Sequence, residues 1–420
     1  MTHTNKHTTI ANKLMATTLM LAATMMTACH SDNDDGDGQP TASRTLLMYM
    51  PWSGDDSALT SYFWQNISDM KTAYGKSGAA DERIVVFISA TATDGYMFDI
   101  DDYRGCSSSA LAQYRHISSP SITTAEGIAS LIGDMKAMAP ARTYSMTIGC
   151  HGMGWLPVDG KTKGFGAAAA THFIPYWQNA TPGGAMTRFF GGTSTQYQVE
   201  TATLAEAIAL TGTKMGFILF DDCYMSSIEA AYDLRHAADY IIACPTEVMA
   251  DGMPYATIGA HLLGTPDYGA VCQGFISHYS SSGYPYGTIG VTACAELDSL
   301  ASIMRRINSA YKFDASLTDS LQRMDGYTPA IFHDYGDYVA HLCADSALLA
   351  QFNEQLARAV PYKGHTAEFP SMSRADGAPY HGGVYTYTIR AYSGTTTSDA
   401  STNQKATGSR ESTAWYKATH

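Results

Sequence analysis

The chain has 420 residues, of which 45% are hydrophobic and 15% are charged. It is therefore too apolar for a disordered protein and long enough to bury a large core. The formal net charge of −13 repels phosphate backbones, which argues against nucleic acid as a partner and favours cationic substrates.

The first 28 residues have the pattern of an export signal. Two lysines precede an apolar run, 14–26, that is too short to span a bilayer. Small residues directly before Cys29 resemble a bacterial lipobox, in which cleavage leaves this cysteine as a lipidated N-terminus, although Met26 stands where leucine is usual. We expect an exported lipoprotein anchored to the outer membrane or cell surface of a Gram-negative bacterium, with simple secretion as the alternative.

Residues 29–43 are expected to form an acidic, flexible tether, because acids and glycines replace apolar residues there. Part of it fits the start of a calcium loop, namely Asn33, Asp35, Asp37 and Gly38. The bidentate glutamate that such a loop needs is replaced by Arg44, so no calcium site is predicted in the tether.

Eight cysteines are present, and no two of them form a C-x-x-C pair. This spacing argues against a zinc ribbon or a thioredoxin-type motif, and the histidines show no metal-ligand spacing. Without Cys29 the number is odd, so at least one thiol stays unpaired within the chain.

Strand-like apolar runs and helical periodicities alternate along the chain after residue 43. Strands are expected at 44–50, 83–89, 144–149, 215–220 and 240–243, and helices at 57–74, 125–137 and 203–210, with another after Ser226. This alternation predicts an α/β fold with a mostly parallel sheet covered by helices on both faces. The connection 157–198 is too long for an ordinary loop and is expected to be functional or disordered.

Beyond Pro254 the helical stretches become longer. Helices are expected at 268–280, 296–311 and 346–360, strands at 288–293 and 383–389, and a polar loop at 393–412. The predicted organisation is a catalytic domain at 44–255 with a C-terminal α/β region, 256–420, packed against it.

Two of the predicted strand ends carry reactive side chains. His151 stands in a glycine-rich turn after the strand 144–149, and Cys223 follows the strand 215–220. Ligands of a parallel sheet bind beyond the carboxyl ends of its strands. An imidazole that meets a thiol there can assist thiolate formation and protonate a leaving amine. The pair predicts a cysteine-hydrolase dyad.

The surroundings of this pair fit the same chemistry. Ser226 and Glu229 have capping-box spacing, which predicts a helix start about three residues past Cys223. A helix N-terminus lowers a thiol pKa. The backbone N–H groups of Gly152 and Cys223 are candidates for an oxyanion hole. Cys150 faces the opposite way from His151 on an extended strand and is interpreted as core.

A strand ending in His-Gly and a second ending in Asp-x-Cys resemble the caspase-like cysteine peptidases, and among them the clostripain family. The likeness is strongest over 220–255, and the His151-Gly-x-Gly-Trp turn, the strand from Thr45 and the segment 412–416 also match. It implies a caspase-like αβα sandwich with a C-terminal α/β extension. Asp222 departs from the family pattern, in which alanine more often precedes the nucleophile, and a carboxylate beside a thiolate would raise the thiol pKa.

The resemblance also implies cleavage after arginine or lysine. Asp221 lies on the same side of its strand as Cys223, and the resemblance places Asp251 on the opposite wall of the pocket, so that two carboxylates bracket one guanidinium. Family members are processed between the histidine and the cysteine, where this chain has Lys161, Lys163 and Arg188. Calcium enters only through this resemblance, since no liganding pattern can be assigned to it, and no other cofactor is predicted.

Two alternatives stay open at this point. One is a caspase-like peptidase with another residue preference, which requires only that Asp221 and Asp251 be structural. The other is a catalytically silent surface lipoprotein of the same fold that binds peptide or glycan. The intact cysteine and histidine favour catalysis, and Asp222 is the feature that favours silence.

Overall fold

The computed structural model describes residues 42–51, 59–158, 197–373, 379–381 and 383–420. The chain divides into two units, 1–39 and 40–420, and all described residues belong to the second. The signal peptide with Cys29, and the predicted cleavage sites Lys161, Lys163 and Arg188, lie outside the described residues. No helix in the described ranges is long and apolar enough to cross a membrane.

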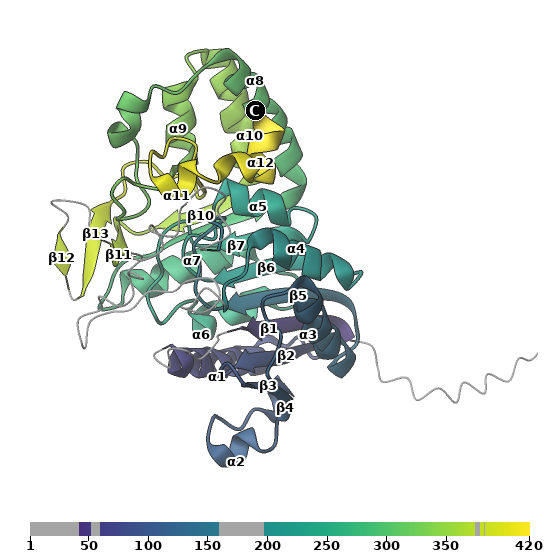
Figure 1. Cartoon of the computed structure of the whole chain (residues 1–420). Helices are drawn as coiled ribbons and strands as arrows, with labels where there is room; N and C mark the ends of the chain where they lie inside the picture. Colours follow the sequence, from purple (N-terminus) through teal and green to yellow (C-terminus); the bar gives the residue numbers. More distant parts are fainter. Residues whose placement is uncertain (1–41, 52–58, 159–196, 374–378, 382) are drawn as a thin grey trace, which may run out of the picture. The chain divides into compact units, whose positions relative to one another are not determined.

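The elements follow one another in the alternating order expected from the sequence (Figure 1). The strands of the described residues are β1 Ala42–Met50, β2 Glu82–Ser89, β3 Asp94–Asp99, β4 Arg115–Ser118, β5 Ala141–Gly149, β6 Met215–Asp221, β7 Ala238–Ala243, β8 Thr288–Ala293, β9 His333–Asp334, β10 Tyr362–His365, β11 Glu368–Ser371, β12 Tyr380–His381, β13 Val384–Thr388 and β14 Thr396–Thr397. The α-helices are α1 Thr60–Ser77, α2 Ser108–Leu111, α3 Ala125–Met138, α4 Thr201–Leu210, α5 Ile228–Leu234, α6 Tyr255–Ile258, α7 Tyr268–Ser280, α8 Leu297–Ala310, α9 Tyr335–Leu342, α10 Ser346–Ala359, α11 Gln404–Thr407 and α12 Ala414–Thr419.

The main sheet of the described residues has nine strands in the order β10-β8-β7-β6-β5-β1-β2-β3-β4. Its five central strands, from β7 to β2, are parallel. The strands added at both ends are antiparallel. The parallel centre confirms the predicted α/β fold, while the antiparallel ends were not foreseen. Strands on both sides of residue 255 belong to this one sheet, and the predicted domain boundary stays a prediction.

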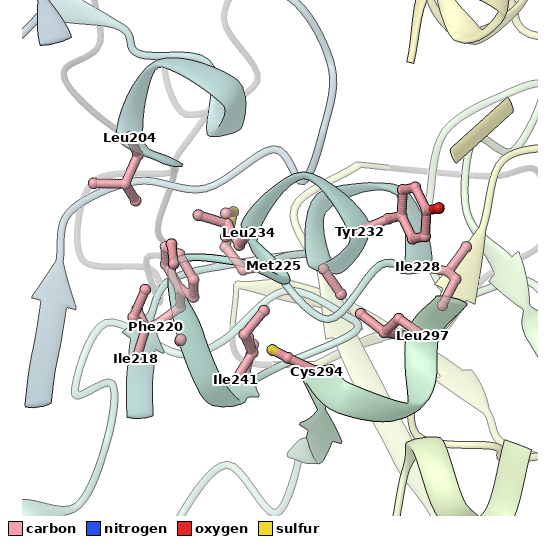
Figure 2. Close-up of a cluster of buried hydrophobic side chains, with 14 of the residues drawn as sticks. Leu204, Ile218, Phe220, Met225, Ile228, Tyr232, Leu234, Ile241, Cys294 and Leu297 are labelled. Carbon is pink, nitrogen blue, oxygen red and sulfur yellow. The ribbon is translucent and has the colours of Figure 1, made fainter. Parts of the chain in front are cut away.

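Helices cover both faces of the sheet because its central strands are apolar on both sides. On β6, Ile218 and Phe220 face one cluster of buried side chains, and Phe217 and Leu219 face the other. Figure 2 shows the first cluster, where side chains of α4, α5, β6, β7 and the start of α8 meet. Burial of each large aliphatic or aromatic side chain stabilises the fold by about 1.5–3 kcal/mol. The sheet is therefore a rigid frame that positions the turns at the carboxyl ends of its strands.

A polar segment near the C-terminus is buried against this frame. Residues 393–398, which the sequence predicts as loop, include the short strand β14 and are all buried. The Thr396 amide donates to the Ser226 carbonyl at 3.0 Å, and the Ser226 hydroxyl donates to the Gly394 carbonyl at 2.8 Å. The segment is thus hydrogen-bonded to the chain just after Cys223.

Candidate active site

The two predicted catalytic residues follow adjacent strands. β5 and β6 are parallel neighbours, and Gly149 pairs with Asp221 at their carboxyl ends. His151 comes two residues after the end of β5, and Cys223 two residues after the end of β6. The sheet therefore brings their turns to one edge. The structure also buries both side chains, with 3% of His151 and 1% of Cys223 exposed.

Close packing of these two turns explains the glycines that flank the histidine. A Cβ atom at Gly152 would lie 2.2 Å from the carbonyl oxygen of Cys223 and 2.8 Å from the Asp222 side chain, so only glycine fits there. Gly154 has φ +61°, and a Cβ there would lie 2.9 Å from the Tyr224 carbonyl oxygen. The backbone of the histidine turn is thus held directly against the backbone of the cysteine turn.

A backbone amide reaches the sulfur of Cys223. The N–H of Val248, in the loop after β7, donates to Cys223 Sγ over 3.3 Å. The Tyr224 amide in turn donates to the Thr246 carbonyl at 3.0 Å, which fixes that loop beside the cysteine turn. A donor aimed at sulfur favours the thiolate, the nucleophilic form of cysteine.

Asp222, the departure from the family pattern, binds the histidine turn. Its Oδ1 accepts a hydrogen bond from the Cys150 amide at 2.8 Å, and its Oδ2 lies 3.7 Å from Cys150 Sγ. Cys150 is fully buried among apolar side chains, as the sequence predicts. The carboxylate therefore joins the two strand ends at Cys150.

The two predicted specificity carboxylates differ in exposure. Asp221 is fully buried, and its Oδ1 accepts the Met253 amide at 2.7 Å. Asp251 is exposed, and its carbonyl oxygen accepts the Asn66 side-chain amide at 3.1 Å. Asp221 thus holds the loop that carries Asp251, and only Gly252 stands between the anchored Met253 and the exposed Asp251.

The helix after Cys223 begins one residue later than the capping-box spacing predicts. Ser227 caps α5, because its hydroxyl accepts the Ala230 amide at 3.2 Å. The Ser226 hydroxyl donates instead to the Gly394 carbonyl, and the buried Glu229 carboxylate accepts the Ser398 amide. The predicted capping box is therefore wrong.

Glu229 takes part in a link between the two turns that sequence reasoning missed. Its Oε1 accepts the Ser398 amide at 2.7 Å and the Thr397 hydroxyl at 3.0 Å. The Ser398 hydroxyl in turn accepts the indole N–H of Trp155, in the histidine turn, at 3.0 Å. Burial, reinforced by the nearby charge of Asp399, raises the pKa of Glu229 to about 8. In the sequence, only the Ser-x-x-Glu spacing pointed to Glu229, and it suggested a capping box instead of a link between the two turns.

Among the side chains that the structure describes, no cluster of three or more histidine, cysteine or acidic residues is arranged to hold a metal ion. The expectations about calcium and other cofactors stay predictions.

Comparisons with known proteins agree with this architecture. The clostripain family model matches residues 186–341. A secreted C11 cysteine protease from Bacteroides thetaiotaomicron is 47% identical, with a TM-score of 0.76 over 90% of this chain and 100% of that chain. A clostripain from the same species, crystallised with the peptide inhibitor BTN-VLTK-AOMK, is 55% identical, with a TM-score of 0.52 over 55% of this chain and 99% of that chain.

A more distant structure is an inactive zymogen C11 protease from Parabacteroides distasonis, which is 26% identical with a TM-score of 0.65 over 90% of this chain and 99% of that chain. A search of the curated proteins finds no match. Fold, strand-end chemistry and relatives together define the class, a cysteine endopeptidase. Within that class, the chain belongs to the clostripain family.

Proposed function

We propose that this peptidase hydrolyses peptide bonds after arginine or lysine, with Cys223 as nucleophile and His151 as general base and acid. The observation that carries the proposal is the contact between the two strand-end turns, in which Gly152 packs directly on the backbone of Cys223. The contact joins the turns that carry a histidine and a cysteine, at the strand-end edge where ligands of parallel sheets bind, and it supports a dyad of these two residues.

The chemical steps follow from these groups. His151 accepts the thiol proton, and the thiolate of Cys223 attacks the scissile carbonyl carbon. The N–H groups of Gly152 and Cys223 stabilise the oxyanion that forms. His151 then protonates the leaving amine, which departs as the C–N bond breaks and leaves a thioester. Water, deprotonated by His151, hydrolyses the thioester and releases the acid and the thiol.

The residue preference rests on Asp221 and Asp251. A buried carboxylate at the end of β6 and an exposed one on the loop that it holds suit a long cationic side chain that enters between them. The inhibitor of the B. thetaiotaomicron clostripain carries the peptide VLTK, which has lysine as its last residue. Because that relative is 55% identical to this chain, its inhibitor supports peptide substrates with a basic residue.

Processing and location are part of the same proposal. We infer self-cleavage at Lys161, Lys163 or Arg188, and the description of the P. distasonis relative as an inactive zymogen supports a processed enzyme. The B. thetaiotaomicron relative is described as secreted, which supports export of this chain. Lipidation of Cys29, with anchoring to the outer membrane or cell surface, is the form of export that we propose.

The deciding experiment uses residues 30–420, with and without Cys223→Ala, on fluorogenic peptides that end in Arg, Lys, Asp or Leu. Cys343→Ala is the matched control, because Cys343 is also buried but lies at the end of α9. We expect cleavage after Arg or Lys that is lost in Cys223→Ala and kept in the control. The intact mass should split between residues 157 and 200 over the same hours.

Other outcomes point to the alternatives. Cleavage after Asp or Leu, lost in Cys223→Ala, would leave the dyad standing and refute the acidic pocket. Cleavage that survives Cys223→Ala would refute the nucleophile. No turnover in reducing buffer with calcium, even after trypsin nicking of the loop, would favour a silent binding protein. Asp222, the feature that favours that alternative, accepts a hydrogen bond from the Cys150 amide.

A further inference from the structure

The residue after the proposed nucleophile has an unusual backbone conformation. Tyr224 has φ +58°, in the left-handed region that residues other than glycine seldom adopt. Its side chain is 1% exposed. Such a conformation persists only where the surroundings impose it, and it is concentrated at functional sites. The contacts of this side chain therefore show what sets the geometry beside Cys223.

Glu247 holds the phenol of Tyr224. Its Oε1 accepts hydrogen bonds from the Tyr224 hydroxyl at 2.6 Å and from the Ser371 hydroxyl at 2.5 Å. Its Oε2 accepts the Met372 amide at 2.9 Å. Glu247 is itself 5% exposed, so these hydrogen bonds are buried. They tie the cysteine turn to the end of β11, more than a hundred residues further along the chain.

The ring of Tyr224 is enclosed by a loop that is itself anchored. It stacks on Phe332, with ring centroids 4.9 Å apart, and lies 6.2 Å from the ring of Tyr327. The buried carboxylate of Asp325 accepts the amides of Tyr327, Ile331 and Phe332 at 2.8, 2.8 and 2.5 Å. The position of the Tyr224 ring is therefore fixed by packing, and its hydroxyl has a fixed hydrogen-bond acceptor in Glu247.

The same glutamate sets the position of the amide that reaches the sulfur. Val248, whose N–H donates to Cys223 Sγ at 3.3 Å, is the next residue after Glu247. One side chain therefore holds the chain on both sides of the thiol: Tyr224 on the cysteine turn, and Val248 on the facing loop.

We propose that Glu247 and Tyr224 are positioning residues for the nucleophile. Their hydrogen bond keeps the turn after Cys223 in its left-handed conformation and keeps the Val248 amide on the sulfur. This inference rests on the proposed role of Cys223. It assigns to Glu247 no contact with substrate, so its loss acts on the thiol and leaves recognition of arginine or lysine intact.

Removal of the phenol hydroxyl tests the inference. In the Tyr224→Phe variant of the 30–420 protein, the ring can still pack on Phe332, but the hydrogen bond to Glu247 is lost. We expect kcat to fall about tenfold or more, because small displacements at a reacting centre have effects of this size, while KM stays within about twofold. The pH at which iodoacetamide alkylates Cys223 at half its maximal rate should rise, because the Val248 N–H no longer stabilises the thiolate.

Matched variants separate this role from a purely structural one. Tyr74→Phe also removes a tyrosine hydroxyl that donates to a protein oxygen, the Glu82 carbonyl at 2.7 Å, but in the α1–β2 region. It should leave kcat and the alkylation profile unchanged. Glu247→Gln keeps one carbonyl oxygen and should restore part of the activity that Glu247→Ala loses. Ser371→Ala, which removes a second donor to the same oxygen, should give a smaller shift in the same direction.

The inference is overturned if Tyr224→Phe and Ser371→Ala lower the melting temperature but leave kcat and the alkylation profile at wild-type values. It is also overturned if KM rises while kcat is unchanged, because the hydrogen bond would then serve recognition. Cys223→Ala distinguishes these results from failure of the proposed function: if that variant stays active, the nucleophile itself has been misassigned.

Discussion

At the scale of single residues, position 152 requires glycine because of a distance rather than a backbone angle. We predict that Gly152→Ala loses about 100-fold in kcat/KM, because the two turns must separate to admit a methyl group 2.2 Å from the Cys223 carbonyl oxygen. The free energy of unfolding should fall by about 1–3 kcal/mol, as in other overpacked sites. Peptide kinetics and urea denaturation measure the two effects.

Gly133→Ala is the control for that substitution. A Cβ at Gly133, within α3, would meet no atom within 4 Å. This variant should keep full activity and gain about 0.4–1 kcal/mol, since alanine restricts the unfolded chain more than glycine does. An active Gly152→Ala would show that the two turns need not touch during catalysis.

The exposed carboxylate of Asp251 gives the second prediction at this scale. Asp251→Asn should lower kcat/KM for peptides ending in Arg or Lys by about 10–100-fold, which corresponds to one charge-assisted hydrogen bond. Any residual cleavage after Leu should be unaffected. Asp319→Asn, another exposed aspartate, serves as the control. Equal losses for Arg and Leu peptides would show that Asp251 has no part in selection.

Residue types at the site could be predicted from the sequence, but their contacts could not. His151 and Cys223 stand out because they follow apolar strands directly, and strand ends converge on one edge. The direction of the Asp222 carboxylate depends on the register of β5 against β6, which places the Cys150 amide within 2.8 Å. Strand register is a property of the folded sheet, and one sequence does not reveal it.

At the scale of elements, α5 and the polar segment 393–398 share a buried carboxylate. Folding raises the pKa of Glu229 from 4.5 to about 8, so the folded protein binds this proton more tightly than the unfolded chain does. The stability that results is fully present below pH 4.5 and is lost as the pH rises through 8. Between these values the free energy of unfolding should fall by up to about 1.4 kcal/mol per pH unit.

Glu229→Gln should remove this part of the pH dependence. The amide carbonyl can still accept the Ser398 and Thr397 donors, and it does not ionise. Urea denaturation between pH 5 and pH 8 measures the slope, with the exposed Glu126→Gln as the control. A variant with the wild-type slope would show that Glu229 is already ionised at low pH in the folded protein.

Long apolar or periodic elements could be predicted from the sequence, whereas short strands and the ends of helices were harder to predict. Helix α7 spans 268–280, as its spacing predicts, and β8 spans the expected 288–293. Helix α1 continues past the predicted end at 74 to Ser77, where Gly78 with φ +71° ends it. Strands β3 and β4 were not predicted because they are short, and β4 is a largely exposed edge strand. Periodicity carries little signal over so few residues.

The polar segment 393–398 illustrates a different limit. Its composition of serine, glycine and threonine is typical of exposed loops. It is buried because the chain after Cys223 and Glu229 supplies partners for its polar groups. Such pairing joins residues about 170 positions apart, so no local pattern could indicate it.

At the scale of the whole molecule, the structure holds the seven cysteines of the described residues as thiols, and among them only Cys106 is exposed. We predict that reducing agent changes the melting temperature of residues 30–420 by less than about 1 °C, whereas loss of a disulfide worth about 2–4 kcal/mol would lower it by several degrees.

Thiol counting checks the same prediction. In the native protein the exposed Cys106 should react with a thiol reagent in a phase separate from that of Cys223, and Cys106→Ser should abolish the Cys106 phase. The denatured, unreduced 30–420 protein should titrate seven thiols, because the structure holds all seven of these cysteines as thiols. A lower count that reductant restores would reveal a disulfide.

The hydrogen bonds between the segment 393–398 and the chain after Cys223 also bear on the order of events during synthesis. Ser398 links Glu229 to Trp155, and it leaves the ribosome well after both of those residues. A nascent chain can therefore form its strands and both turns while the two turns still lack this link. We expect nascent or truncated chains that lack the segment 393–398 to be inert, so that the peptidase cannot act on neighbouring proteins before this segment has been made and docked.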